Sequence, residues 1–73
     1  MKKLVICNQK MFLSYDEAKI LKEQMDDIDL SGVDLVVCPN FLNMDVFSEY
    51  NLGAQDCHYE ERGAYTGSVS PYD

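Results

Sequence analysis

Residues 4–11 read Leu4-Val5-Ile6-Cys7-Asn8-Gln9-Lys10-Met11, so four apolar residues are followed at once by two amides and a cation. A continuous apolar run of this length is typical of a strand covered on both faces, as in a parallel sheet. In parallel α/β proteins, ligands bind beyond the carboxyl ends of the strands, which is where Asn8 and Lys10 fall. A lysine there supplies a compact positive charge for a phosphate or a developing oxyanion.

The remaining sequence predicts an alternation of strands and helices. We expect strands at about residues 3–7, 33–38 and 52–57, and helices at about 15–29 and 41–50. The crossovers are long enough for parallel pairing, so the predicted fold class is α/β. A polar loop with two glycines follows the third strand, at about residues 58–69.

Local signals define the first helix. Ser14 and Glu17 have the spacing of a capping box, with Ser14 as the N-cap. One apolar helical face follows at spacings of three, four and three residues: Ala18, Leu21, Met25 and Ile28. In the third strand, the small residues Gly53 and Ala54 suit a tightly packed sheet.

The last residues, Ser70-Pro71-Tyr72-Asp73, have the pattern of a helix start, with Ser70 as N-cap and Pro71 at the first helical position. From this ending we expect the chain to be a truncated piece of a larger domain. Three strands in such a piece leave both outer edges unpaired, and unpaired edges are templates for aggregation. We therefore expect a chain that is aggregation-prone, partly disordered or dependent on other chains.

Composition sets limits on partners. The chain has 73 residues and a net charge of −7, which argues against nucleic acids and anionic membrane surfaces as ligands. An anionic substrate would be repelled by the overall field, so a local cation such as Lys10 would have to overcome it. No apolar stretch approaches the roughly 20 residues that span a bilayer, and we expect a cytoplasmic protein.

Cys7, Cys38 and Cys57 each stand at the end of a predicted strand and show no metal-binding spacing. We predict that all three are small core residues of a reduced protein. A structural zinc site would need a fourth ligand, and His58 is the only histidine. We therefore predict no metal and no cofactor.

Three segments of the chain resemble the N-terminal part of the triosephosphate isomerase family. Residues 6–11 are similar to the family's G-N-W-K-M after strand one, and residues 36–41 to its V-x-x-P-P-F after strand two. Residues 52–57 and 63–71 are similar to its G-A-Q-N strand and G-A-[FY]-T-G-E-[IV]-S loop. The resemblance implies strands one to three and helices one and two of a (β/α)8 TIM barrel. The implied reaction interconverts dihydroxyacetone phosphate and glyceraldehyde 3-phosphate in glycolysis and gluconeogenesis.

The resemblance also implies site residues. Asn8 and Lys10 fall on the family's substrate-contacting asparagine and lysine, and the lysine helps to hold the phosphorylated triose and to stabilise the enediolate. From the residues alone, Lys10 could be a surface lysine at a strand end, and Asn8 an amide that caps the loop. The family is homodimeric, and the positions implied for the dimer interface are Gln55, Asp56, Tyr65, Thr66 and Gly67.

The chain departs from the family pattern at several positions. Gln9 stands for the usual tryptophan and Cys7 for the usual glycine, while Ser68 replaces a glutamate that pairs across the interface. Phe12 stands where a polar residue is common and Asp56 where asparagine is usual. The departures at Gln9 and Ser68 leave the effect on loop packing and dimer stability open.

The family's electrophilic histidine follows strand four and its glutamate base follows strand six, so both would lie beyond Asp73. His58 follows strand three and matches neither position. The isolated chain is therefore predicted to be inactive. The alternative is a stand-alone, non-catalytic assembly or binding module that uses its unpaired strand edges and the loop at 58–69. A flavodoxin-like ligand domain is disfavoured, because no phosphate-binding glycine loop follows the first strand.

Overall fold

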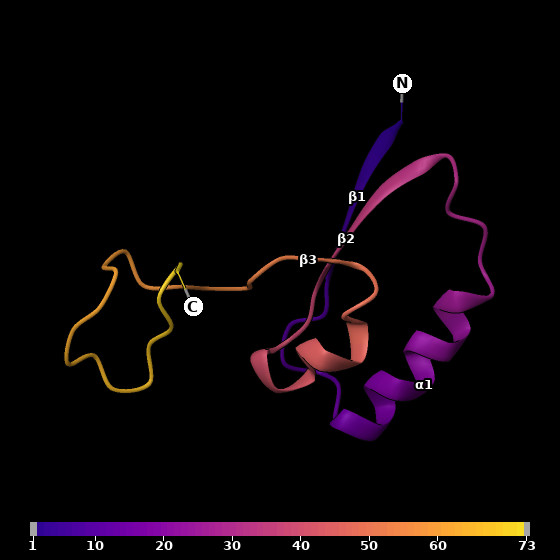
Figure 1. Cartoon of the computed structure of the whole chain (residues 1–73). Coiled ribbons are helices and arrows are strands. Elements are labelled where there is room, and N and C mark those ends of the chain that lie inside the picture. Colours follow the sequence, from indigo (N-terminus) through magenta and orange to yellow (C-terminus); the bar gives the residue numbers. More distant parts are fainter. Residues whose placement is uncertain (1, 73) are drawn as a thin grey trace.

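The computed structural model describes residues 2–72, and its strands form one parallel sheet in the order β1-β2-β3 (Figure 1). The elements in chain order are β1 (Lys3–Asn8), α1 (Tyr15–Asp26), β2 (Val33–Cys38), the 3-10 helix η1 (Phe41–Phe47) and β3 (Asn51–Leu52). This architecture confirms the predicted α/β class and is consistent with part of a (β/α)8 barrel.

The third strand is shorter than predicted. It spans Asn51–Leu52, so most of the predicted range 52–57 is wrong. Leu52 pairs with Val37, which leaves only Cys38 of β2 beyond that point, and the Gly53 N–H still donates to the Val37 carbonyl at 2.9 Å. Pro39 then ends β2 because it has no N–H to offer. Residues 54–72 therefore have no partner strand in the described part of the chain.

Both helices also end earlier than predicted. The α1 helix ends at Asp26 rather than near residue 29, because the chain tightens into a final three-residue turn in which Ile28 N–H donates to Met25 O at 3.1 Å. The predicted helix at 41–50 is the 3-10 helix Phe41–Phe47. Asn40 caps it, since Asn40 Oδ1 accepts from the N–H groups of Leu42 and Asn43 at 3.0 and 3.2 Å.

The predicted capping box of α1 is present. Glu17 N–H donates to Ser14 Oγ at 3.2 Å, and Ser14 N–H donates to Glu17 Oε1 at 3.1 Å. These bonds favour the charged carboxylate, so the backbone and side-chain hydrogen bonds with Ser14 lower the pKa of Glu17. Ser70 Oγ accepts from the Tyr72 N–H at 3.1 Å, but residues 71 and 72 form a turn, so the structure does not show the predicted helix start.

The core is small and lies where α1 meets β2 and η1. Ala18, Val37 and Phe47 are fully buried in it. The partly buried residues packed around them are Leu21, Met25, Leu35, Val46 and Tyr50. Gly53 adds a close approach, since a Cβ there would lie 2.8 Å from Cys38 Sγ and 3.2 Å from Val36 Cγ1. This confirms the tight packing predicted for that glycine.

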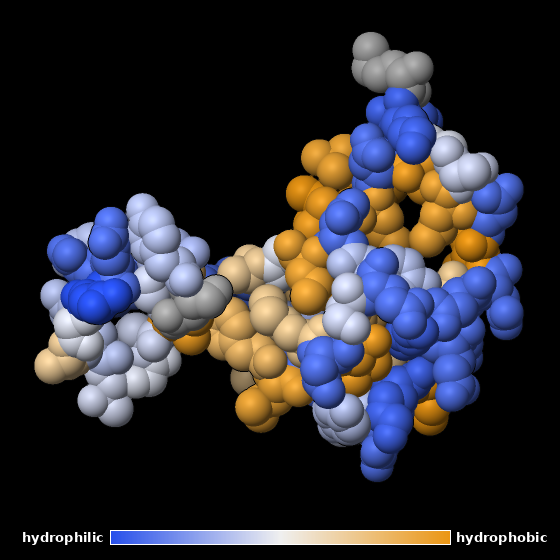
Figure 2. Space-filling view, viewed as in Figure 1, coloured by the Kyte–Doolittle hydropathy of each residue, from blue (hydrophilic) through white to orange (hydrophobic). Residues whose placement is uncertain are grey.

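The β1 strand is more open than its sequence predicted. Leu4 and Ile6 are 64% and 60% exposed, so the expectation that both faces are covered is wrong for the described chain. Figure 2 shows apolar residues gathered over the strand region of the visible face.

The cysteine prediction holds for Cys38, which is buried, but Cys7 is only half-buried and Cys57 is exposed because it lies beyond the end of the sheet. No helix within residues 2–72 has the length and apolarity to cross a membrane.

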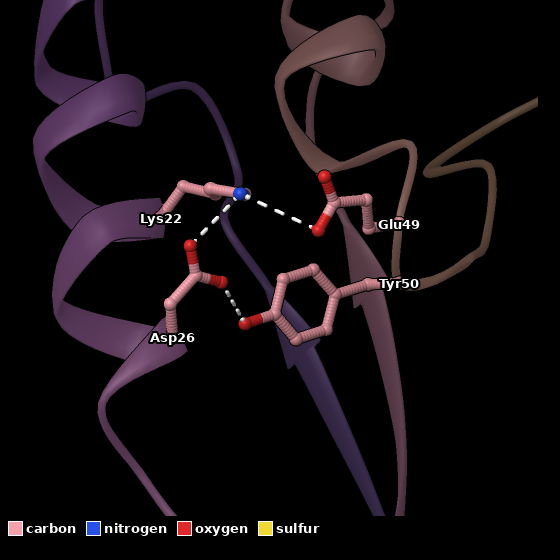
Figure 3. Close-up of polar contacts among 4 residues, drawn as sticks. All are labelled: Lys22, Asp26, Glu49 and Tyr50. Atoms are coloured by element: carbon pink, nitrogen blue, oxygen red, sulfur yellow. Dashed lines mark hydrogen bonds and ion pairs between the residues drawn. The ribbon is translucent and has the colours of Figure 1, made fainter.

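A polar network joins α1 to the segment after η1 (Figure 3). Lys22 Nζ lies 2.8 Å from Asp26 Oδ2 and 3.6 Å from Glu49 Oε2, and the Tyr50 hydroxyl donates to Asp26 Oδ1 at 2.7 Å. The hydrogen bonds from Lys22 and Tyr50 lower the pKa of the Asp26 carboxyl. The hydrogen bond to Asp26 raises the pKa of Lys22.

We expect α1 to lose stability as the pH falls below about 4, the ordinary carboxyl range. Glu17 and Asp26 have lowered pKa values in the folded chain, so the unfolded state binds more protons there and acid favours unfolding. Far-UV circular dichroism between neutral and acid pH measures the loss of helix. The double variant Glu17→Gln, Asp26→Asn should lose less helix between the same pH values than the parent chain, and an equal loss would contradict the assignment.

Candidate functional site

The end of β1 holds Lys10 in an unusual backbone conformation. Its φ is +57°, in the left-handed region that side chains other than glycine rarely adopt. This conformation costs about 1–2 kcal/mol for a residue with a Cβ. The Asn8 side chain supports it, because Asn8 Oδ1 accepts from the Lys10 N–H at 2.9 Å. Asn8 thus has the loop-capping role that was one of its two predicted interpretations.

Gln55 connects this turn to the next strand. Its Nε2 donates to Lys10 O at 3.0 Å and to Cys38 O at 2.8 Å. Both partners are carbonyl oxygens, which only accept, so the amide nitrogen must face them. The Gln9 N–H also donates to Cys38 O, at 3.1 Å, and each carbonyl oxygen has two lone pairs for such bonds. The structure therefore brings Asn8, Lys10 and Gln55 together at the carboxyl end of the sheet.

The Lys10 side chain is exposed at this end of the sheet, and within residues 2–72 its ammonium forms no ion pair. A cation in that position is available to an incoming anion. The whole chain carries a net charge of −7, so the positive charge of Lys10 stands out locally against a negative electrostatic field. The resemblance implied an interface role for Gln55, and the sequence gave no sign that its side chain holds the Lys10 backbone. The available signal was an amide with two donor hydrogens three residues after the last residue of β3.

The loop at residues 58–69 forms a lobe apart from the sheet (Figure 1). Of the predicted interface residues, Tyr65, Thr66 and Gly67 belong to this loop, whereas Gln55 contacts the end of β2. The His58 N–H closes the base of this lobe by donating to Val69 O at 2.8 Å. Thr66 and Gly67 are exposed in it, and Gly67 has a φ of +83°. The radius of gyration is 13.9 Å, where a compact chain of this length would have about 11 Å. Within one chain, then, Thr66 and Lys10 are not brought together.

Aromatic stacking organises the lobe internally. His58 stacks on Tyr65 with ring centroids 4.2 Å apart and on Tyr59 at 4.6 Å. His58 Nδ1 also accepts from the Glu60 N–H at 3.0 Å, so this nitrogen is engaged by the loop itself. Asp56 is exposed at the base of the lobe, where it lines a cavity of about 120 Å³. Within residues 2–72, no three of the histidine, cysteine, aspartate and glutamate side chains form a group suited to a metal ion.

Gln9 differs from Gln55 in its surroundings. Its Nε2 and Oε1 are buried and have no hydrogen-bond partner among residues 2–72. The side chain lines a cavity of about 310 Å³ between α1 and the sheet, whose other walls include Val5, Leu21 and Met25. A buried amide without partners lowers the stability of a fold, because its hydration is lost and not replaced.

We expect Gln9→Met to raise the free energy of unfolding by about 1–2 kcal/mol, because methionine has a similar shape and no polar atoms to leave unpaired. Gln55→Met is the matched control, since the same chemical change there removes two hydrogen bonds and should destabilise. Urea unfolding of both variants measures the difference. Two shifts of the same sign would contradict the contrast between the two glutamines.

Comparison with known proteins places this arrangement in context. The family model described as Triosephosphate isomerase matches residues 3–72. The triosephosphate isomerase of Dehalococcoides mccartyi is 39% identical over 82 residues, which cover 97% of this chain and 32% of that protein. The triosephosphate isomerase of Carboxydothermus hydrogenoformans is 40% identical over 78 residues, covering 96% of this chain and 31% of that protein. That of Clostridium perfringens is 33% identical over 75 residues, covering 93% and 30%. The chain thus spans about a third of the length of these curated relatives.

Proposed function

The chain belongs to the triosephosphate isomerase family, and from this we propose that it forms the first three β/α units of an enzyme that interconverts dihydroxyacetone phosphate and glyceraldehyde 3-phosphate. One observation supports the proposal above others. The exposed Lys10 ammonium lies just beyond the carboxyl end of β1. The backbone of Lys10 is held on both sides, because its N–H donates to the Asn8 side chain and its carbonyl accepts from the Gln55 side chain.

In this proposal Lys10 and Asn8 contact the phosphorylated triose. The lysine charge attracts the phosphate and stabilises the negative oxygen that develops as the enediolate forms. Proton transfer between the two carbons also needs a positioned base and an electrophile that polarises the carbonyl. By the family pattern both lie beyond Asp73, so we propose that residues 1–73 alone are inactive. His58 Nδ1 already accepts from the Glu60 N–H, which supports the proposal that His58 takes no part in the reaction.

We further propose that the complete enzyme is a cytoplasmic homodimer of glycolysis and gluconeogenesis. The lobe at 58–69 would insert beside the partner's site, with Thr66 and Gly67 at its tip and Gln55 and Asp56 at its base. Its separation from the sheet supports this role, because a segment that contacts another subunit must extend from its own (Figure 1). Ser68 lacks the carboxylate of the family's loop glutamate, so this interface would miss one ion pair.

The test compares two proteins in a host strain that lacks its own isomerase. One is the product of the complete open reading frame that contains residues 1–73, and the other is the 73-residue chain by itself. We expect isomerase activity from the first and none from the second. Activity that purifies with the 73-residue chain would contradict the proposed division of the machinery, and an inactive complete product would contradict the proposed reaction.

A second candidate is a non-catalytic assembly or binding module. The exposure of Leu4 and Ile6 on β1 favours it, because such apolar surface is suited to contact with another chain. The same comparison separates the two candidates. An open reading frame that stops after Asp73, together with a stable oligomer of that product, would favour the module over the enzyme.

A further inference from the structure

We propose that Gln55 is a positioning residue for Lys10, acting through the backbone of the β1 turn rather than through contact with substrate. The inference rests on the proposed function in one respect, namely that Lys10 is the cation that serves the reaction. It adds a role that differs from the interface role implied by family resemblance. Its basis is the pair of hydrogen bonds from Gln55 Nε2 to Lys10 O and Cys38 O.

The first step is the conformation of Lys10. A left-handed lysine persists only where its surroundings hold it, because an extended or right-handed alternative is favoured intrinsically. Two side chains hold this one, Asn8 at the N–H and Gln55 at the carbonyl, with donor–acceptor distances of 2.9 and 3.0 Å. With both peptide groups of the residue fixed, the direction of its Cα–Cβ bond is fixed as well. That bond sets where the ammonium can reach.

The second step is the chemistry of position 55. One side chain must donate a hydrogen bond to each of two carbonyl oxygens, and the nitrogen of a primary amide carries the two hydrogens that this requires. Asparagine has a shorter side chain, methionine has no donor, and an ionised glutamate would set negative oxygens against both carbonyls. Gln55 links residues that are 45 and 17 positions away in sequence, so it couples the turn after β1 to the end of β2.

The test uses the complete enzyme and two variants of this residue. Gln55→Met removes both donors and should lower kcat/KM by about 10²-fold, the effect of a small misplacement of a reacting group. Gln55→Glu should show a comparable loss at neutral pH and partial recovery as the pH falls, since the protonated carboxyl can again donate one hydrogen bond. Gln55→Met should show no such recovery. A purely structural role would not produce that difference in pH profile.

Hydrogen exchange of the Lys10 amide, followed by NMR, provides a readout that does not depend on activity. We expect exchange about fivefold to tenfold faster in Gln55→Met, the loss that corresponds to one ordinary hydrogen bond. Unchanged exchange together with unchanged kcat/KM would overturn the positioning role while leaving the proposed reaction intact. If the complete protein had no isomerase activity, the proposed reaction would fail, and the exchange measurement would still decide the role of Gln55.

Discussion

A Lys10→Met substitution in the complete enzyme is expected to lower kcat/KM by about 10²–10³-fold, the loss found when one preorganised electrostatic group is removed from an active site. Methionine keeps the Cβ and an unbranched side chain that is one atom shorter than that of lysine, but it lacks the charge. The backbone of the turn, held by Asn8 and Gln55, should therefore stay in place. Steady-state kinetics in both directions of the reaction measures the loss.

A second substitution at the same position separates charge from backbone conformation. Lys10→Gly also removes the charge, but glycine adopts a φ of +57° without the penalty of a Cβ. After its own entropic cost, we expect a net gain of about 0.5–1 kcal/mol in the free energy of unfolding, with activity as low as in Lys10→Met. A Lys10→Met enzyme with nearly unchanged kcat/KM would refute the electrostatic role of Lys10.

Phe47→Ala is expected to unfold the 73-residue chain or leave it at the edge of stability. Phe47 is fully buried at the centre of the core, between α1 and β2, and truncation of such a residue costs about 3–5 kcal/mol. Typical stabilities per residue give a chain of this length a total of roughly 4–11 kcal/mol. The loss is therefore a large fraction of the whole.

The matched control for that substitution is Phe12→Ala. Phe12 is 81% exposed, so the same atoms are removed from a side chain that buries little surface. Urea unfolding followed by circular dichroism should show a midpoint close to that of the parent for Phe12→Ala. For Phe47→Ala it should show a transition at much lower urea or none. Equal midpoints in the two variants would mean that Phe47 is not the centre of the core.

Local signals predicted the first part of the fold well. The Ser14 and Glu17 pair fixes the start of α1 by hydrogen bonds within four residues, and the apolar runs mark β1 and β2. The predicted length of the third strand was wrong, because the length of a strand depends on the strand with which it pairs. The small residues Gly53 and Ala54 are compatible with a strand, but β2 ends at Cys38, so within residues 2–72 positions 54–57 have no partner strand.

In the candidate site, too, local features could be predicted from the sequence and contacts between distant residues could not. The sequence placed Asn8 and Lys10 at the end of a strand, because that position follows from the apolar run before them. It could not predict the support from Gln55, since this depends on contacts between residues 45 positions apart. Nor could it predict the exposure of Leu4 and Ile6, because an apolar pattern specifies a face and not what covers it.

The close approach of Gly53 to β2 has a consequence for how this sequence can evolve. A Cβ at position 53 would lie 2.8 Å from Cys38 Sγ, whereas the site uses only the main-chain carbonyl of Cys38. Position 38 is therefore free to change its side chain without altering the acceptor for Gln55, but its size limits what position 53 can become. Among homologous sequences, an alanine at 53 should occur with a residue smaller than cysteine at 38. The two positions should vary together.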